Sequence, residues 1–102
     1  MSQEFDYIVI GSGSAGGIVA ARLSENGKHD VLCLEAGERD ESFFWTKVPV
    51  ASAFLYDDPR ANWCYWSEPS QAYAGRKLFV PRGRILGGSS AINGMVYVRG
   101  QR

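Results

Sequence analysis

The sequence predicts an α/β fold that begins with a parallel strand–helix–strand unit. Two short apolar stretches lie at residues 5–10 and 31–34, a glycine-rich bend at residues 11–17 follows the first, and Glu35 follows the second. Continuous apolar runs are typical of strands that are buried on both faces of a parallel sheet. We therefore expect residues 1–37 to form a Rossmann-like βαβ unit whose two strands are buried.

A helix is expected between the two strands. Small and apolar side chains recur from Ile18 to Leu23, directly after the glycine-rich bend. Gly27 follows at the place where a helix commonly ends on a residue with positive φ. We also expect Cys33, inside the second apolar run, to be a buried strand residue.

The bend between the first strand and the helix has the spacing G-x-G-x-x-G, at Gly11, Gly13 and Gly16. In nucleotide-binding βαβ units the first glycine allows a sharp turn, the second lets a diphosphate approach the backbone, and the third allows close helix–strand packing. Glu35 lies 24 residues after Gly11, where an acid can accept hydrogen bonds from a ribose. A plain glycine turn with a surface glutamate is the alternative. The pattern alone does not separate FAD from NAD.

Composition excludes several classes of protein. Eleven basic and eleven acidic residues cancel, so no overall field attracts nucleic acid or anionic lipid. No apolar run approaches the ~20 residues of a transmembrane helix. Two cysteines and one histidine are too few for a zinc site or a disulfide framework. We expect a cytoplasmic protein that does not bind nucleic acid, and its oligomeric state stays open.

Charge and glycine content divide the chain into three segments. Residues 1–70 carry eleven acids and five bases, whereas residues 71–102 carry six bases and no acid. We expect a βαβ unit over residues 1–37, an aromatic connecting or cover segment over residues 38–74, and a basic glycine-rich segment over residues 75–102. Aromatic residues at this density also fit a plain core, and that interpretation is the commoner one.

A second glycine-rich bend lies in the basic segment. Gly87 and Gly88 precede Ser89 and Ser90, which suggests a loop that leads into a short helix with a serine cap. Such a bend would offer a second set of backbone amides to an anion, with the nearby Arg84 adding charge. An ordinary glycine turn into a capped helix explains the same residues equally well.

The sequence resembles the glucose–methanol–choline (GMC) flavin oxidoreductases. Residues 83–100 resemble the first signature of that family, and residues 6–17 and 34–37 resemble its FAD-binding start. Residues 62–69 are similar to its connecting segment, most closely in the choline-dehydrogenase branch. The resemblance covers essentially the whole chain, and it implies an incomplete part of a two-domain α/β flavoprotein.

The resemblance implies a set of FAD contacts. The pyrophosphate would contact Gly11, Gly13, Ser14, Ala15 and Gly16, and the adenosine ribose would contact Glu35. The other side of the cofactor would be lined by Gly87, Gly88 and Ser89, with Arg84 nearby. The segment that runs past the flavin ring would be Asn93, Gly94, Met95 and Val96. Some members attach the flavin covalently through a histidine, and Ile92 stands at the position that we align with it. We therefore expect non-covalent FAD.

The implied reaction is the oxidation of an alcohol to an aldehyde or ketone, with hydride transfer to the flavin and onward passage of electrons to an acceptor. The family's catalytic histidine has no counterpart here. His29 precedes the second strand and so lies at the opposite end of the sheet from the glycine bend. We expect an N-terminal fragment of a longer enzyme, from a truncated gene or an incomplete record, inactive alone. The alternatives are an NAD-binding module of a dehydrogenase and a non-functional remnant.

Overall fold

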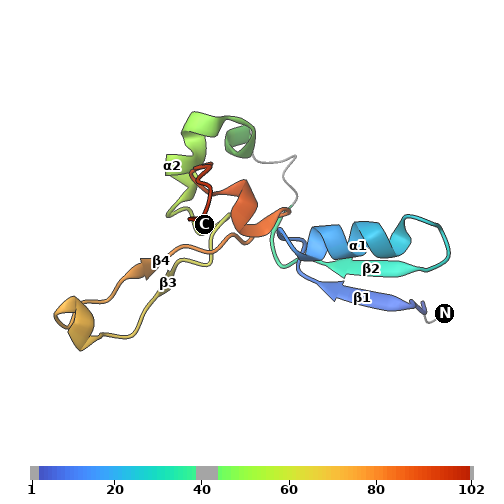
Figure 1. Ribbon diagram of the computed structural model, residues 1–102, viewed down its shortest axis with the longest axis horizontal. Helices are drawn as coiled ribbons and strands as arrows, with labels where there is room; N and C mark the ends of the chain where they lie inside the picture. The colour runs from blue at the N-terminus through green and yellow to red at the C-terminus, as the bar shows by residue number, and fades with distance from the viewer. Residues whose placement is uncertain (1–2, 39–43, 102) are drawn as a thin grey trace.

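The computed structural model describes residues 3–38 and 44–101, whose helices and strands form two groups (Figure 1). The first group comprises β1 (Tyr7–Ile10), α1 (Gly16–Ser24) and β2 (Val31–Leu34). The second group contains α2 (Ser52–Leu55), β3 (Tyr65–Trp66) and β4 (Phe79–Val80), with 3-10 turns at Phe44–Lys47, Pro49–Ala51, Gln71–Tyr73 and Gly88–Ala91.

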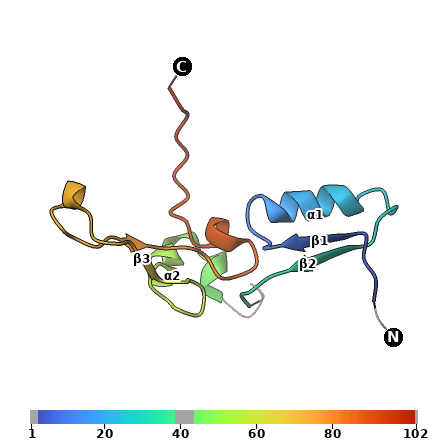
Figure 2. The same cartoon turned by 90° about the horizontal axis from the view of Figure 1, so that it is seen from below.

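The first group is the predicted βαβ unit. β1 and β2 are parallel, from the pair Tyr7 and Val31 to the pair Ile10 and Leu34. Figure 2 shows α1 lying over one face of this two-stranded sheet. A Cβ on Gly16 would overlap the carbonyl oxygen of Gly11, so only glycine lets the helix start this close to the bend. The predicted α/β fold is therefore confirmed.

The prediction that both strands are buried is wrong for the described residues. The side chains of Ile8 and Ile10 are 59% and 86% exposed, and Cys33 is exposed as well. The reason is that α1 covers one face of the sheet only, and each strand has a single neighbour. The apolar run correctly predicted a strand, but burial depends on layers that residues 3–38 and 44–101 do not supply.

The apolar core lies in the second group and is aliphatic. Leu55, Ala61, Ile85 and Ile92 are buried against one another. The aromatic residues described between Phe44 and Trp66 are all exposed to a considerable degree. The interpretation of the aromatic segment as plain core is therefore wrong for this part of the chain.

The second group includes an antiparallel ribbon that extends outward from it. β3 and β4 pair with Tyr65 opposite Val80, and the arm projects away from the rest of the molecule (Figure 1). The pairing continues toward the core, where the amide of Trp63 donates to Arg82 and the amide of Arg84 donates to Ala61, both at 2.8 Å.

Asn62 holds the base of this ribbon. Its side chain is 1% exposed and makes three hydrogen bonds: Nδ2 donates to the carbonyl of Tyr56, and Oδ1 accepts from the amides of Cys64 and Arg82. Because a buried amide must have partners, this position suits an asparagine and no apolar residue.

The two groups meet where the chain returns to the end of β2. Ile85 forms a parallel bridge with Glu38, and the amide of Leu86 donates to the Glu38 carbonyl at 3.2 Å. A Cβ on Gly37 would overlap the Arg84 carbonyl group, so the crossing needs a glycine. This contact places the second glycine-rich bend beside the first.

No helix within residues 3–38 and 44–101 has the length and apolar character needed to cross a membrane.

The substitution Asn62→Leu tests the role of the buried amide. It leaves the amides of Cys64 and Arg82 without their acceptor, so we expect a loss of about 2–4 kcal/mol of stability. The apparent Tm of the complete gene product that carries these residues should fall by roughly 2–4 °C. Asn26→Leu, in the exposed turn after α1, is the matched control and should leave Tm nearly unchanged; equal shifts in both variants would contradict the prediction.

Candidate functional site: a hollow between two glycine-rich bends

A hollow of about 730 Å³ lies between the two glycine-rich bends, at the carboxyl ends of β1 and β2. The carboxyl edge of a parallel sheet is where α/β proteins bind their ligands. The hollow is lined by Ile10, Gly11, Gly13, Ser14, Ala15, Gly16, Leu34, Glu35, Ala36, Trp63, Gly83, Gly88 and Ser89. Eight of the predicted site residues thus border one cavity: Gly11, Gly13, Ser14, Ala15, Gly16, Glu35, Gly88 and Ser89.

The first bend offers backbone donors to this hollow. The amides of Gly13, Ser14 and Ala15 have no acceptor among the residues that the structure describes. They precede the first turn of α1, where the helix dipole adds partial positive charge. A row of free amides at the start of a helix is suited to a phosphate group.

The two bends touch through their backbones. A Cβ built on Gly88 would lie 2.9 Å from the Cα of Gly13, closer than real side chains come. A Cβ on Gly13 would instead make an ordinary van der Waals contact, with Gly88 Cα as its nearest neighbour at 3.8 Å. Gly88 is therefore needed to let the bends meet, whereas Gly13 leaves room inside the hollow.

Glu35 lies at the end of β2 and is held by three donors. Its Oε2 accepts from the amide and the hydroxyl of Ser12, at 2.8 and 2.7 Å, and its Oε1 accepts from the amide of Gly37 at 2.9 Å. Burial by itself raises the pKa of Glu35, but the hydrogen bonds from Ser12, Gly37 and Ala36 outweigh it and hold the pKa below its ordinary value. Glu35 therefore stays an anionic acceptor.

The second bend differs from the prediction in two ways. Gly88–Ala91 is a single 3-10 turn, and it starts at Gly87, whose φ is +91°, without a serine cap. The hydroxyl of Ser89 instead accepts from the amide of Gly83, and the amides of Gly87 and Gly88 donate to Ser12 and Ile85. The predicted serine cap is therefore wrong, and these two glycine amides already have protein acceptors.

Arg84 lies behind the wall of the hollow. Its guanidinium carbon is 5.4 Å from the ring centroid of Trp63, a cation–π contact, and its buried Nε has no hydrogen-bond partner. Buried donors are normally satisfied. Arg84 thus carries an unused donor next to the site.

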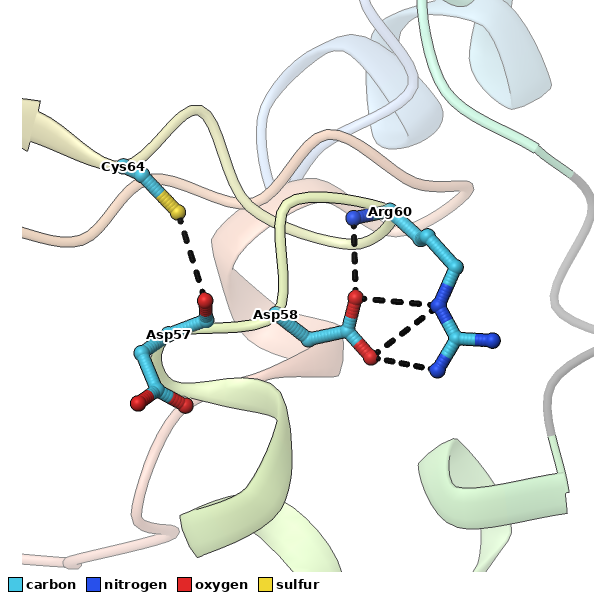
Figure 3. A network of polar contacts seen from close by, with 4 residues as sticks. All are labelled: Asp57, Asp58, Arg60 and Cys64. Carbon is cyan, nitrogen blue, oxygen red and sulfur yellow. Dashed lines mark hydrogen bonds and ion pairs between the residues drawn. The ribbon is translucent and has the colours of Figure 1, made fainter.

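The loop that leads to Trp63 is fixed by a network of polar contacts. Figure 3 shows the guanidinium of Arg60 against the carboxylate of Asp58, at 2.7 Å between Nη2 and Oδ2. The hydrogen bond from Arg60 holds the pKa of Asp58 below its ordinary value. The Cys64 thiol donates to the Asp57 carbonyl at 3.6 Å. This loop sets where Trp63 enters the hollow.

The remaining predicted residues lie elsewhere. Asn93 and Gly94 border a second hollow of about 280 Å³, which shares Ser89 with the first. Met95 borders a third, of about 110 Å³. Val96 is 82% exposed and borders none of these three hollows, because the chain extends away from the body after the last turn (Figure 2).

The sequence did not predict five lining residues, Ile10, Leu34, Ala36, Trp63 and Gly83, or Ser12, which binds Glu35. Ser12 occupies the first unspecified position, x, of the G-x-G-x-x-G pattern, and no spacing rule assigns that position a role. Trp63 is one aromatic among many, and only the return of the chain at Gly83 brings it to the hollow.

His29 lies at the far end of the sheet, as predicted. Its ring makes an edge contact with Tyr7, and its Nδ1 is 3.8 Å from a carboxylate oxygen of Asp6. The glycine bend follows the opposite end of β1.

A βαβ unit with free amides at its first bend and a carboxylate at the end of its second strand defines a dinucleotide-binding protein. Comparison with known proteins narrows the class: residues 5–102 match the GMC oxidoreductase family. The chain belongs to that family.

Three relatives illustrate the match. An oxygen-dependent choline dehydrogenase of Vibrio vulnificus is 49% identical over 100 residues, which are 98% of this chain and 18% of that protein. Pyridoxine 4-oxidase from Mesorbium loti superposes with a TM-score of 0.86 at 39% identity, over 95% of this chain and 19% of that one. A formate oxidase variant of Aspergillus oryzae, studied for FAD modification, superposes with a TM-score of 0.78 at 34% identity. The match covers 87% of this chain and 16% of that one. The chain thus spans about a fifth of their length.

The depressed pKa of Glu35 predicts a pH dependence of stability. A carboxyl group whose pKa is lower in the folded state stabilises the fold above its unfolded pKa of about 4.3, and this contribution is lost as the pH falls through the folded pKa. Glu35→Gln should therefore lower Tm at pH 7, and its difference from the wild type should shrink as the pH falls through the folded pKa. Thermal unfolding between pH 3 and 7 measures this; Glu25→Gln, at an exposed ion pair, is the control.

Proposed function

We propose that this chain forms the FAD-binding portion of an oxidoreductase that oxidises CH–OH groups of donors. The observation that carries the proposal is the hollow in which three free amides of the first bend face the backbone of the second bend, with the Glu35 carboxylate at its side. That arrangement provides donors for a diphosphate and an acceptor for a ribose hydroxyl within one cavity.

The residues present fit such a cofactor. The missing Cβ of Gly13 leaves space where a diphosphate would approach the backbone, and no residue that the structure describes accepts a hydrogen bond from the amides of residues 13–15. Arg84, whose guanidinium lies over the ring of Trp63 in the wall of this cavity, adds positive charge close to it. These are the groups that an anionic dinucleotide would satisfy.

The proposed roles follow from these positions. Glu35 accepts from the adenosine ribose, and Gly88 and Ser89 close the opposite wall. The diphosphate is held by Gly11, Gly13, Ser14, Ala15 and Gly16. Ser89 also borders the hollow that contains Asn93 and Gly94, which offers a continuous path toward the flavin half. Gly87 supports the wall from behind, and Met95 and Val96 continue the chain past the flavin. The segments 1–37, 38–74 and 75–102 are proposed as functional units on the same grounds.

When bound, FAD supplies the acceptor for the hydride that leaves the alcohol carbon. The described residues bind and orient the cofactor, and they do not include the proton acceptor, because the single histidine of the sequence lies at the far end of the sheet. An alcohol and an electron acceptor are the proposed partners, and the choline-dehydrogenase similarity makes choline the first substrate to test. Cytoplasmic location stays a prediction.

Gly13→Val tests the proposed site by filling the hollow. Gly13 has a φ outside the left-handed region, and a Cβ there makes only an ordinary contact with Gly88 Cα at 3.8 Å, so the valine side chain occupies the space that a diphosphate would need. The complete gene product should purify yellow, with FAD released on denaturation and identified by chromatography, and Gly13→Val should lose nearly all of it. Gly100→Val, where a Cβ meets nothing within 4 Å, is the control. Bound NAD in place of FAD would contradict the proposal.

Non-covalent binding has a separate test. Ile92 is buried in the apolar core and has no group that could bond to a flavin. Acid precipitation of the purified protein should therefore leave the flavin in the supernatant, as measured by its absorbance near 450 nm. Flavin that stays with the pellet after washing would show a covalent bond.

A further inference from the structure

Ser12 joins three separate parts of the site. It is 8% exposed and lies inside the first glycine bend. Its hydroxyl donates to Glu35 Oε2 at 2.7 Å, and the amide of Gly87 in the second bend donates to the Ser12 carbonyl at 3.2 Å and lies 3.4 Å from the Ser12 hydroxyl. One small side chain therefore contacts the first bend, the end of β2 and the second bend.

We propose that Ser12 is a positioning residue, which fixes the Glu35 carboxylate and fastens the second glycine bend to the first, so that both walls of the nucleotide site are preformed. This inference rests on the proposed function for its ligand. The contacts of Ser12 with Glu35 and Gly87, which we call the Ser12 latch, are a property of the protein without ligand.

The hydroxyl makes contacts that the backbone cannot replace. The amide of Ser12 and its carbonyl would keep their hydrogen bonds to Glu35 and Gly87 in any variant. Only the hydroxyl can at once donate to the carboxylate and accept from the Gly87 amide. Its bond to the carboxylate is charge-assisted and short, which makes it the stronger of the two.

The latch also decides which oxygen of Glu35 is available. Oε2 accepts both donors of Ser12, whereas Oε1 accepts the amide of Gly37. The remaining acceptor capacity is therefore greater on Oε1, and this oxygen is the one offered to a ribose hydroxyl. A carboxylate that is held in place before binding loses less side-chain freedom when the nucleotide arrives.

The contact between the bends explains why the latch matters for the opposite wall. Gly88 approaches Gly13 without room for a Cβ, yet glycine backbones supply little packing of their own. The hydrogen bonds from Gly87 to Ser12 are the polar links that hold these backbones together. Loosening them should widen the hollow at Gly88 and Ser89.

The first experiment uses the cofactor-free protein. In the complete gene product, Ser12→Ala should raise the rate of amide hydrogen exchange in peptides covering residues 84–91 by roughly 3-fold, because the Gly87 amide loses its contact with the hydroxyl but keeps its bond to the Ser12 carbonyl. Ser24→Ala removes a hydroxyl that bonds only within α1 and is the matched control. Equal exchange in wild type and Ser12→Ala would overturn the latch.

The second experiment measures FAD affinity and its dependence on pH. The dissociation constant should rise roughly 10-fold in Ser12→Ala at pH 7. The pH at which binding weakens on acidification should also move upward, because Glu35 loses a donor that favours its charged form. The groups that bear on Glu35 are burial and the donors Ser12, Gly37 and Ala36, and no charged side chain of the described residues contributes.

A double-mutant cycle separates positioning from a general structural effect. If Ser12 acts through Glu35, the losses in Ser12→Ala and Glu35→Gln should be less than additive, whereas additive losses or an unshifted acid limb would overturn the inference. A wild-type protein that binds no FAD would refute the proposed function instead. The exchange experiment would still decide the latch.

Discussion

The close approach of two glycine backbones is the constraint on which the rest of this structure depends. Gly88 meets Gly13 where no Cβ fits, and the pairing of Leu86 with Glu38 brings the chain to that point. Residues more than seventy positions apart thereby form the facing walls of one hollow. The basic, glycine-rich segment, residues 75–102, contributes Gly83, Gly88 and Ser89 to the lining of this hollow, opposite the amides of the first bend.

Glu35 has a structural role in addition to its proposed role in binding the ribose. Its carboxylate ties Ser12 to Gly37 and so joins the bend after β1 to the end of β2. The same hydrogen bonds keep it ionised, which is the state that a ribose hydroxyl needs as an acceptor. An acid in this position thus stabilises the site before any ligand is present. It is also why a small polar neighbour such as Ser12 has an influence beyond its size.

The described chain is open rather than compact. Its radius of gyration is 16.9 Å, compared with about 13 Å for a compact domain of this length. Apolar side chains remain exposed on β1 and in residues 95–98, and the buried core is limited to a small aliphatic cluster. The relatives that share this arrangement are about five times as long. The described residues therefore combine a hollow whose walls are joined by hydrogen bonds with a small apolar core.

The sequence by itself determined the local elements. The bounds of β2, the glycine bend, the turn at Gly27 and the acid at Glu35 all follow from short patterns, because strand periodicity and glycine turns depend on near neighbours. Only the tertiary structure decided the exposure of Ile10, the absence of a serine cap, and the selection of Trp63 from many aromatics. Those features depend on which distant segment returns to the site, and long-range pairing such as that of Ile85 with Glu38 leaves no local signal in the sequence.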